Sequence, residues 1–223
     1  MYQELIFKTR DIGFLYFSII IINVVIGLFI TIDGIDGCGS TTHSKLLAGF
    51  LENKGYNVFL TREPTNSEIG KLLRIYLKND KIPPETDALL FAADRSYHYL
   101  IDIKEKQEDG FIVISDRYKE ASIVYQSVQS ERISTKWIEE INKFAQDPDI
   151  TIILDIDPAI SLSRKTQKDL EKFENTPFLD KVREIYLERA KSQNYYVINS
   201  DDIIEFVQGK IQKLVLKHLK QKA

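Results

Sequence analysis

The sequence is poor in the residues that mark secreted, metal-binding and nucleic-acid-binding proteins. It has a single cysteine, Cys38, which excludes an internal disulfide and suits the reducing cytoplasm. Its three histidines, His43, His98 and His218, lack the spacing of metal ligands, so we expect no histidine metal site. The charges nearly balance, at 30 lysines and arginines against 33 aspartates and glutamates, so we expect no nucleic-acid partner.

Long apolar runs are also scarce, and the longest lies near the N-terminus. Residues 14–32 are apolar apart from breaks such as Ser18 and Asn23, and Lys8 and Arg10 precede them, as in a signal anchor. If the first strand takes residues 27–32, residues 14–26 are too few to cross a bilayer core of about 30 Å. We therefore expect no membrane span, and interpret residues 1–26 as an apolar arm, either an extension of the domain or a start-site artefact.

Short apolar segments alternate with helical patterns along the rest of the chain, which has no repeat and no linker. The predicted strands are residues 27–32, 56–61, 111–115, 151–156 and 195–198. The main predicted helices are residues 42–53, 67–78, 84–107, 120–127, 134–145 and 201–220. This alternation predicts an α/β fold, with a five-stranded parallel sheet covered by helices on both faces and a single domain over residues 27–223.

A glycine-rich stretch, residues 34–42, joins the first strand to the first helix. The P-loop pattern G-x-x-x-x-G-K-[ST] is matched by Gly34, Gly39 and Thr41, whereas the lysine position holds Ser40. Glycines let backbone amides converge on an anion, and a helix N-terminus adds partial positive charge. The stretch predicts a phosphate site; the alternative is a tight strand–helix turn without a ligand.

Polar side chains follow the other strands, at the edge of the sheet where ligands gather in α/β folds. They are Arg62, Glu63, Asp116, Arg117, Asp155 and Asp157. Asp116 is best placed to hold Mg²⁺ with a hydroxyl of the loop, although Asp116-Arg117 could instead be a strand-end ion pair. We interpret Asp155 and Asp157 as helix caps before Pro158.

Two further segments have the composition of a nucleotide site. Phe91 and Arg95 lie four residues apart, so they share a helix face and could clamp a nucleobase. The alternative puts Phe91 in the core and Arg95 on the rim. Residues 164–172 are basic, as in a lid over phosphates, or else form a solvated helix face.

Together these residues resemble one family, the thymidylate (dTMP) kinases, which are P-loop nucleoside monophosphate kinases. The resemblance covers about residues 29–218 and lies in several segments in the family's order. They are FITIDGIDGCGSTT at 29–42, TREP at 61–64, GKLLR at 70–74, LLFAADR at 89–95, ISDRY at 114–118 and SIVYQ at 122–126. It implies the P-loop kinase architecture, with a short lid at about residues 164–176.

The resemblance also implies roles for individual residues. ATP would bind to Gly34, Ile35, Asp36, Gly37, Cys38, Gly39, Ser40, Thr41 and Thr42, with its adenine near residues 199–201. dTMP would bind to Asp36, Arg62, Arg74, Phe91, Arg95, Arg117, Ser122, Tyr125 and Gln126. Thr41 and Asp116 would organise Mg²⁺, and Asp116, Arg117 and Arg164 would be catalytic.

Within that set the implied contacts differ. Phe91 would stack on thymine while Arg95 holds the edge of the base, and Tyr125 would lie near the sugar. Arg62, Arg74 and Arg117 would hold the phosphate of dTMP.

Ser40 departs from the family pattern. Loss of one preorganised stabiliser of developing charge costs about 3–4 kcal/mol, or roughly 10²–10³ in rate. We expect Lys45 to be no substitute, because it lies along the helix and turned away from the loop mouth. The hypothesis is that Arg164, Lys165 or Lys168 of the lid supplies the missing cation. Phe173 also replaces a tyrosine familiar in the family's lid.

The sequence thus predicts a cytoplasmic enzyme that makes dTDP from dTMP, with ATP as donor and Mg²⁺ as cofactor. Two alternatives stay open: a kinase for another nucleoside monophosphate, and a catalytically silent nucleotide-binding protein, favoured by Ser40 alone. A homodimer is expected from the family resemblance, for which the apolar face around Trp137 and Phe144 could serve.

Overall fold

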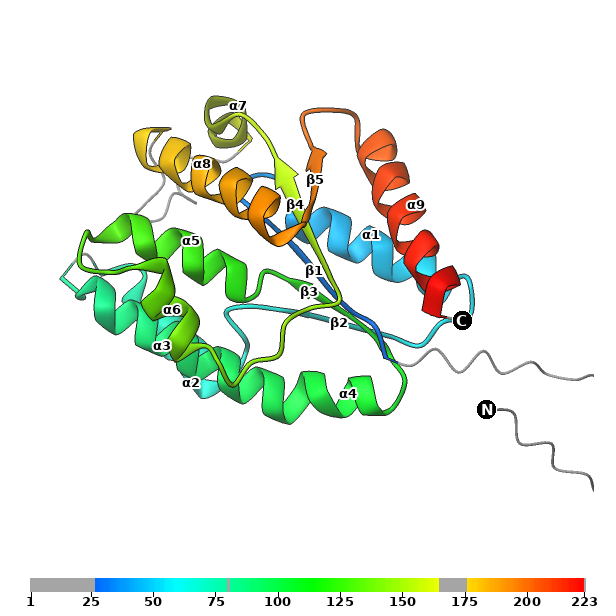
Figure 1. The fold of residues 1–223 in the computed structure, drawn as a ribbon, viewed down its shortest axis with the longest axis horizontal. Helices are drawn as coiled ribbons and strands as arrows, with labels where there is room; N and C mark the ends of the chain where they lie inside the picture. Colours follow the sequence, from blue (N-terminus) through cyan, green and yellow to red (C-terminus); the bar gives the residue numbers. More distant parts are fainter. Residues whose placement is uncertain (1–26, 80, 165–175, 223) are drawn as a thin grey trace, which may run out of the picture.

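The computed structural model describes residues 27–79, 81–164 and 176–222 (Figure 1). The predicted arm, residues 1–26, and most of the predicted lid, residues 165–175 with Lys165, Lys168 and Phe173, lie outside the described residues. The strands are β1 (Phe29–Gly34), β2 (Val58–Arg62), β3 (Ile112–Asp116), β4 (Ile150–Asp155) and β5 (Tyr196–Asn199). All pair in parallel, in the order β2-β3-β1-β4-β5, which confirms the predicted five-stranded parallel sheet.

Helices cover both faces of this sheet, with α1 and α9 on one face and α5 and α8 on the other (Figure 1). These four helices are α1 (Ser40–Glu52), α5 (Lys119–Gln129), α8 (Thr176–Gln193) and α9 (Ile204–Lys222). The remaining helices are α2 (Glu68–Tyr76), α3 (Pro84–His98), α4 (Lys104–Glu108), α6 (Thr135–Ile141) and α7 (Pro158–Ser163). The predicted helix over residues 84–107 is one run in three parts, because the π-helical turn η1 (Tyr99–Ile103) joins α3 to α4.

Burial on both faces explains why the central strands β1, β3 and β4 are almost continuously apolar. Every residue of β1 is buried, and Ile30 and Ile32 pack with Leu47 of α1 and Val207 of α9 in the main core. The ladder between β1 and β3 sets Ile32 opposite Asp116. This register brings the end of β3 beside Gly34, where the glycine-rich loop begins.

The two aspartates around the end of β4 have different roles. Asp157 caps α7, because its carboxylate accepts a hydrogen bond of 2.8 Å from the backbone N–H of Ala159, as predicted. The predicted cap at Asp155 is wrong. Its carboxylate accepts two bonds from Arg183 of α8, at 2.6 and 3.0 Å, and this bidentate pair holds α8 against the end of β4.

Among the described residues, no helix is both long enough and apolar enough to cross a bilayer.

Two helical glycines, Gly70 and Gly49, give a matched test of how closely the helices pack against neighbouring backbone. A Cβ at Gly70 of α2 would lie 2.1 Å from the backbone oxygen of Thr65, which cannot move independently of the chain. We expect Gly70→Ala to destabilise the protein by about 1–3 kcal/mol through overpacking. Gly49→Ala in α1 is the control: nothing lies within 4 Å of its added Cβ, so helix propensity should stabilise the protein by about 0.5–1 kcal/mol. Urea unfolding measures both, and equal changes in the two variants would contradict this account.

Candidate active site

The glycine-rich loop after β1 depends on three glycines with positive φ. Gly34, Gly37 and Gly39 have φ values of 153°, 81° and 96°. Side chains there would also collide, since a Cβ at Gly34 would lie 2.5 Å from Leu154 O, and one at Gly37 would lie 2.5 Å from Ser161 O. The loop thus packs closely against neighbouring backbone and leads directly into the N-terminus of α1.

A cavity of about 600 Å³, here called the loop cavity, opens at this helix N-terminus. It is lined by Asp36, Gly37, Cys38, Gly39, Ser40, Thr41, Thr42, His43, Arg117, Arg164, Ser200, Asp202 and Ile204. Arg164 donates to Gly37 O at 3.5 Å and to Ser200 O at 3.3 Å, so it ties the loop to the turn after β5. Convergent backbone amides, the helix N-terminus and two arginines make this cavity suited to phosphate groups.

Cys38 is a buried filler of the loop, as expected from its size. Burial raises the pKa of its thiol to about 11, so the thiol stays protonated near neutral pH.

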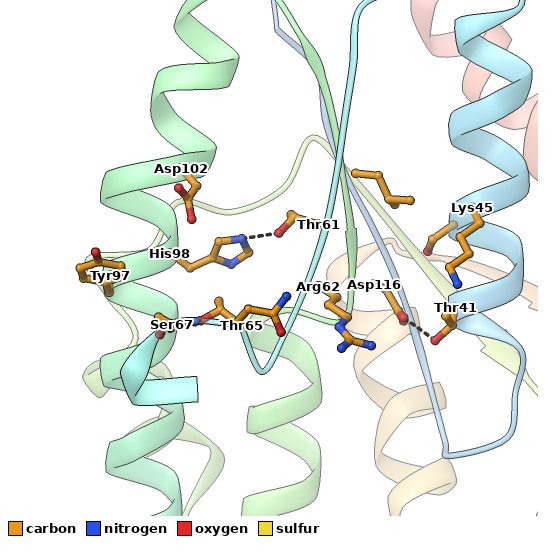
Figure 2. Close-up of a pocket in the computed structure, with 13 residues that line it drawn as sticks. Thr41, Lys45, Thr61, Arg62, Thr65, Ser67, Tyr97, His98, Asp102 and Asp116 are labelled. Atoms are coloured by element: carbon orange, nitrogen blue, oxygen red, sulfur yellow. Dashed lines mark hydrogen bonds between the residues drawn. The ribbon is translucent and has the colours of Figure 1, made fainter. Parts of the chain in front are cut away.

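Thr41 and Asp116 meet beside the loop. The Thr41 hydroxyl donates a 2.5 Å hydrogen bond to Oδ2 of Asp116, as the dashed line in Figure 2 shows. The side chain of Asp116 is only 7% exposed, and its Oδ1 has no hydrogen-bond partner among the described residues. Such an orphaned carboxylate oxygen beside a loop hydroxyl fits Mg²⁺, which takes one or two carboxylates and completes its shell with water and phosphate oxygens. Nowhere in the described parts of the chain do three His, Cys, Asp or Glu side chains form a larger metal cluster.

Asp36 and Arg117 form the wall between the loop cavity and a second cavity. Arg117 Nη2 lies 2.8 Å from Asp36 Oδ1, and its guanidinium lies 5.4 Å from the ring centroid of Tyr125. The Tyr125 hydroxyl donates to Asp36 Oδ2 at 3.0 Å and accepts from Asp36 N at 2.9 Å. Arg117 has φ of 70°, a conformation that is strained for arginine, and its N–H is held by Ile32 O at 3.1 Å.

The second cavity, here called the aromatic cavity, has a volume of about 220 Å³. It is lined by Asp36, Glu63, Pro64, Arg74, Leu77, Phe91, Arg95, Arg117, Tyr118, Ala121, Ser122, Tyr125, Gln126 and Gln129. Phe91 lines one side of this cavity and is half-buried. Gln126 is buried, and its side-chain amide oxygen accepts no hydrogen bond from any described residue. An aromatic face next to an unsatisfied amide is an arrangement that can bind a planar, hydrogen-bonding ring.

Arg95 is fully buried next to Phe91, with only 1% of its side chain exposed. It donates through Nε to Glu63 at 2.8 Å, through Nη1 to Asn142 at 2.7 Å and through Nη2 to Ser122 at 3.0 Å. The alternative that set Arg95 on the rim and Phe91 in the core is therefore wrong. Burying a guanidinium requires this full set of partners, since an unpaired buried charge is very costly.

Sequence reasoning assigned no role to several residues of this network. Glu63 is 6% exposed and also lies 3.1 Å from Nδ1 of His98, whose Nε2 lies 2.7 Å from the Thr61 hydroxyl. Tyr118 lines the aromatic cavity, and the Arg95 guanidinium lies 5.6 Å from the centroid of its ring. The signal for Glu63 was available, because it stands in the TREP segment, directly after β2.

The predicted phosphate-binding arginines divide between two places. Arg74 and Arg117 both line the aromatic cavity, and Arg74 donates to Pro64 O at 2.5 Å and to Thr65 O at 2.6 Å. Arg62 is exposed and instead lines a third cavity beside the edge strand β2, here called the edge cavity. Arg62 ends β2 and lines the edge cavity together with Thr61 and His98, whereas Glu63, the next residue, lines the aromatic cavity.

The edge cavity has a volume of about 590 Å³ and extends from α1 past β2 to α3 (Figure 2). It is lined by Thr41, Ser44, Lys45, Leu60, Thr61, Arg62, Thr65, Asn66, Ser67, Tyr97, His98, Asp102 and Asp116. Lys45 lines this cavity and not the loop cavity, in keeping with the expectation that it turns away from the loop mouth. Figure 2 shows its amine directed along α1 toward Thr41, because helical side chains lean toward the N-terminus of their helix.

A sequence model of the family "Thymidylate kinase" matches residues 32–211. This chain belongs to the thymidylate kinase family. The family prediction is thereby confirmed, and so is the P-loop kinase architecture. The functional roles of individual residues remain predictions.

Three relatives illustrate the similarity, each named "Probable thymidylate kinase". The protein of Pyrobaculum aerophilum is 43% identical over 189 residues, which cover 84% of this chain and 95% of the relative. That of Pyrococcus horikoshii is 41% identical over 201 residues, covering 86% and 97%. That of Methanothermobacter thermautotrophicus is 38% identical over 198 residues, covering 86% and 95%.

One further carboxylate lies in the strand β1 directly before the glycine-rich loop. Asp33 in β1 is fully buried, and its Oδ1 lies 3.4 Å from the Tyr186 hydroxyl. Burial raises the pKa of Asp33 to about 7, an effect that the nearby Arg117 opposes and Glu120 and Asp116 reinforce. The folded protein therefore keeps a proton on Asp33 up to near-neutral pH.

This proton predicts a pH dependence of stability. The unfolded chain releases the Asp33 proton near pH 4 and the folded chain near pH 7, so its contribution to stability is lost as the pH rises through about 7. We expect the free energy of unfolding to decrease between pH 5 and 8, and to decrease less in Asp33→Asn. Urea midpoints across this range measure the slope. Asp180→Asn, at an exposed position, should keep the wild-type slope; an unchanged slope in Asp33→Asn would contradict the assignment.

Proposed function

We propose that this protein transfers the γ-phosphoryl group of ATP to dTMP, which gives ADP and dTDP. The observation that carries the proposal is the shared wall: Asp36 and Arg117 line both the loop cavity and the aromatic cavity. Two nucleotides bound in these cavities would present their phosphates to the same arginine. Phosphoryl transfer needs this head-to-head arrangement, since the attacking and leaving oxygens lie roughly in line.

ATP is the nucleotide of the loop cavity in this proposal. Its phosphates receive the backbone amides of the loop and the N-terminus of α1, while Arg164 and Ser200 lie where the rest of the nucleotide leaves the loop. Gly37 and Gly39 suit this assignment, because a phosphate that lies close to their backbone leaves no room for a side chain.

dTMP is the nucleotide of the aromatic cavity. Phe91 stacks on thymine, and Arg95, held in place by Glu63 and Asn142, donates to the edge of the base. Tyr125, fixed by its two hydrogen bonds to Asp36, lies near the sugar. Arg74 and Arg117 hold the phosphate at the end nearer the loop, with Arg62 approaching from the edge cavity.

The chemistry requires positioning more than proton transfer. A phosphate oxygen of dTMP forms a bond to the γ-phosphorus of ATP, and the bond from that phosphorus to the β–γ bridging oxygen breaks, leaving its electron pair on ADP. Arg117 faces both phosphate groups and stabilises the charge that spreads over the transferred oxygens. Thr41 and Asp116 would hold Mg²⁺, which when bound would supply positive charge to the phosphate groups.

Cytoplasmic location and a homodimer belong to the same proposal. The single cysteine suits the cytoplasm. For the dimer, Phe144 is 69% exposed, whereas Trp137 packs partly against the cluster around Ile138, so the predicted face offers little apolar surface. Exposed apolar side chains along α2, α3 and η1 make a better candidate; they are Leu72, Ile75, Leu89, Tyr97, Leu100 and Ile101.

The decisive measurement is ADP formation from ATP, Mg²⁺ and dTMP, compared with a panel of other nucleoside monophosphates. We expect turnover, with dTMP preferred. Turnover with a different acceptor would support the alternative kinase, and ATP binding without any turnover would support the silent protein favoured by Ser40.

Phe91→Ala tests the acceptor site within this proposal. We expect the KM for dTMP to rise about 10-fold or more, because base–aromatic stacking contributes about 1–3 kcal/mol. The KM for ATP should stay unchanged, since Phe91 lines the aromatic cavity and not the loop cavity. Phe144→Ala, at an exposed position outside both cavities, is the matched control. An unchanged KM for dTMP in Phe91→Ala would remove the stacking role.

A further inference from the structure

Position 40 lacks the P-loop lysine, so the loop carries one positive charge fewer. The described cations near the loop differ in how free they are to replace that charge. Ser40 is buried, and its side chain carries no charge toward the phosphates. Arg164 faces the loop cavity, but it is tied to Gly37 O and Ser200 O and lies 3.6 Å from a carboxylate oxygen of Asp201. A cation without such partners would be freer to contact a phosphate group.

Lys45 is such a cation. It lies on α1 four residues after Thr41, so the two share one face of the helix. Its side chain is exposed and makes no hydrogen bond or ion pair with any other described residue. Figure 2 shows the amine pointing toward Thr41 and the Thr41–Asp116 pair.

The surroundings of Lys45 favour an anion. The edge cavity brings Lys45 and Arg62, two unpaired cations of the described chain, to the corner where Thr41 and Asp116 meet. Two carboxylates line the edge cavity, Asp102 and Asp116. Asp116 is the one bonded to Thr41, and its orphaned oxygen suits a bound cation. A phosphate group beside Thr41 would neutralise both free cations.

We propose that Lys45 replaces the missing P-loop lysine, by contacting the γ-phosphate of ATP from the edge cavity. The inference rests on the proposed kinase function and deepens it. A P-loop lysine reaches the terminal phosphates as a point charge from the loop. Lys45 supplies the same charge from one turn further along the helix. No proton moves in this role; the ammonium group stabilises negative charge on the transferred oxygens.

The test is a double-mutant cycle between positions 40 and 45. In the wild-type background we expect Lys45→Ala to lower kcat about 10²-fold, the typical effect of losing one preorganised donor, with the KM for dTMP little changed. Lys45→Arg should recover part of the rate because it restores a cation. In the Ser40→Lys background the same Lys45→Ala change should cost less than about 10-fold, because the loop then carries its own lysine.

Controls separate this role from a structural one. Lys191→Ala removes an exposed helical lysine that lines none of the three cavities, and should leave kcat at the wild-type value. Thermal unfolding should give wild-type midpoints for Lys45→Ala, since the side chain makes no contact that folding depends on. Two results would overturn the proposal: an unchanged kcat in Lys45→Ala, or a loss of the same size in both backgrounds.

A binding measurement keeps this test independent of the proposed acceptor. If the wild-type protein does not turn over dTMP, the proposed function fails, and titration calorimetry with a non-hydrolysable ATP analogue and with ADP decides the role of Lys45. Weaker binding of the analogue by Lys45→Ala, with ADP binding unchanged, supports a contact to the γ-phosphate. Wild-type affinity for both nucleotides overturns it.

Discussion

The parallel pairing of β1 with β3 is the constraint on which the rest of the site depends. Because Ile32 stands opposite Asp116, the loop after β1 and the Asp116-Arg117 step after β3 leave the sheet side by side. Thr41 can then reach Asp116, and Arg117 can reach Asp36. A shift of this register by one residue would turn Asp116 to the opposite face and separate all four groups.

A buried ionic network supports the aromatic cavity without contributing much to net stability. Arg95 and Glu63 are both nearly inaccessible, and such pairs often add little to folding because both charges lose their water. Their value lies in position: Asn142, Ser122 and Glu63 leave the Arg95 guanidinium one orientation. In the proposed site, a base that met this arginine would find a donor that needs no rearrangement, and preorganisation of this kind lowers the cost of binding.

The sequence was sufficient for the fold because its strands are continuous apolar runs and its loop is marked by glycines. It was insufficient where the outcome depends on contacts between distant segments. The burial of Arg95 requires partners from three separate segments, and no local pattern reveals them. The direction of the Lys45 amine along α1 is a different case: its spacing from Thr41 and the lean of helical side chains were available in the sequence, and the prediction used neither. Asp155 shows the same limit as Arg95, since its partner Arg183 comes from a later helix.

The wall formed by Asp36 and Arg117 has a consequence for cooperativity. Each of the two cavities is bounded by these side chains, so a nucleotide that enters either one changes the orientation or the charge that the other presents. Thermodynamic linkage then requires that ATP alter the affinity for dTMP by the same factor as dTMP alters the affinity for ATP. In the proposed site, the first nucleotide to bind would set how Arg117 divides its interaction between Asp36 and a phosphate, and the second would bind to the arrangement that results.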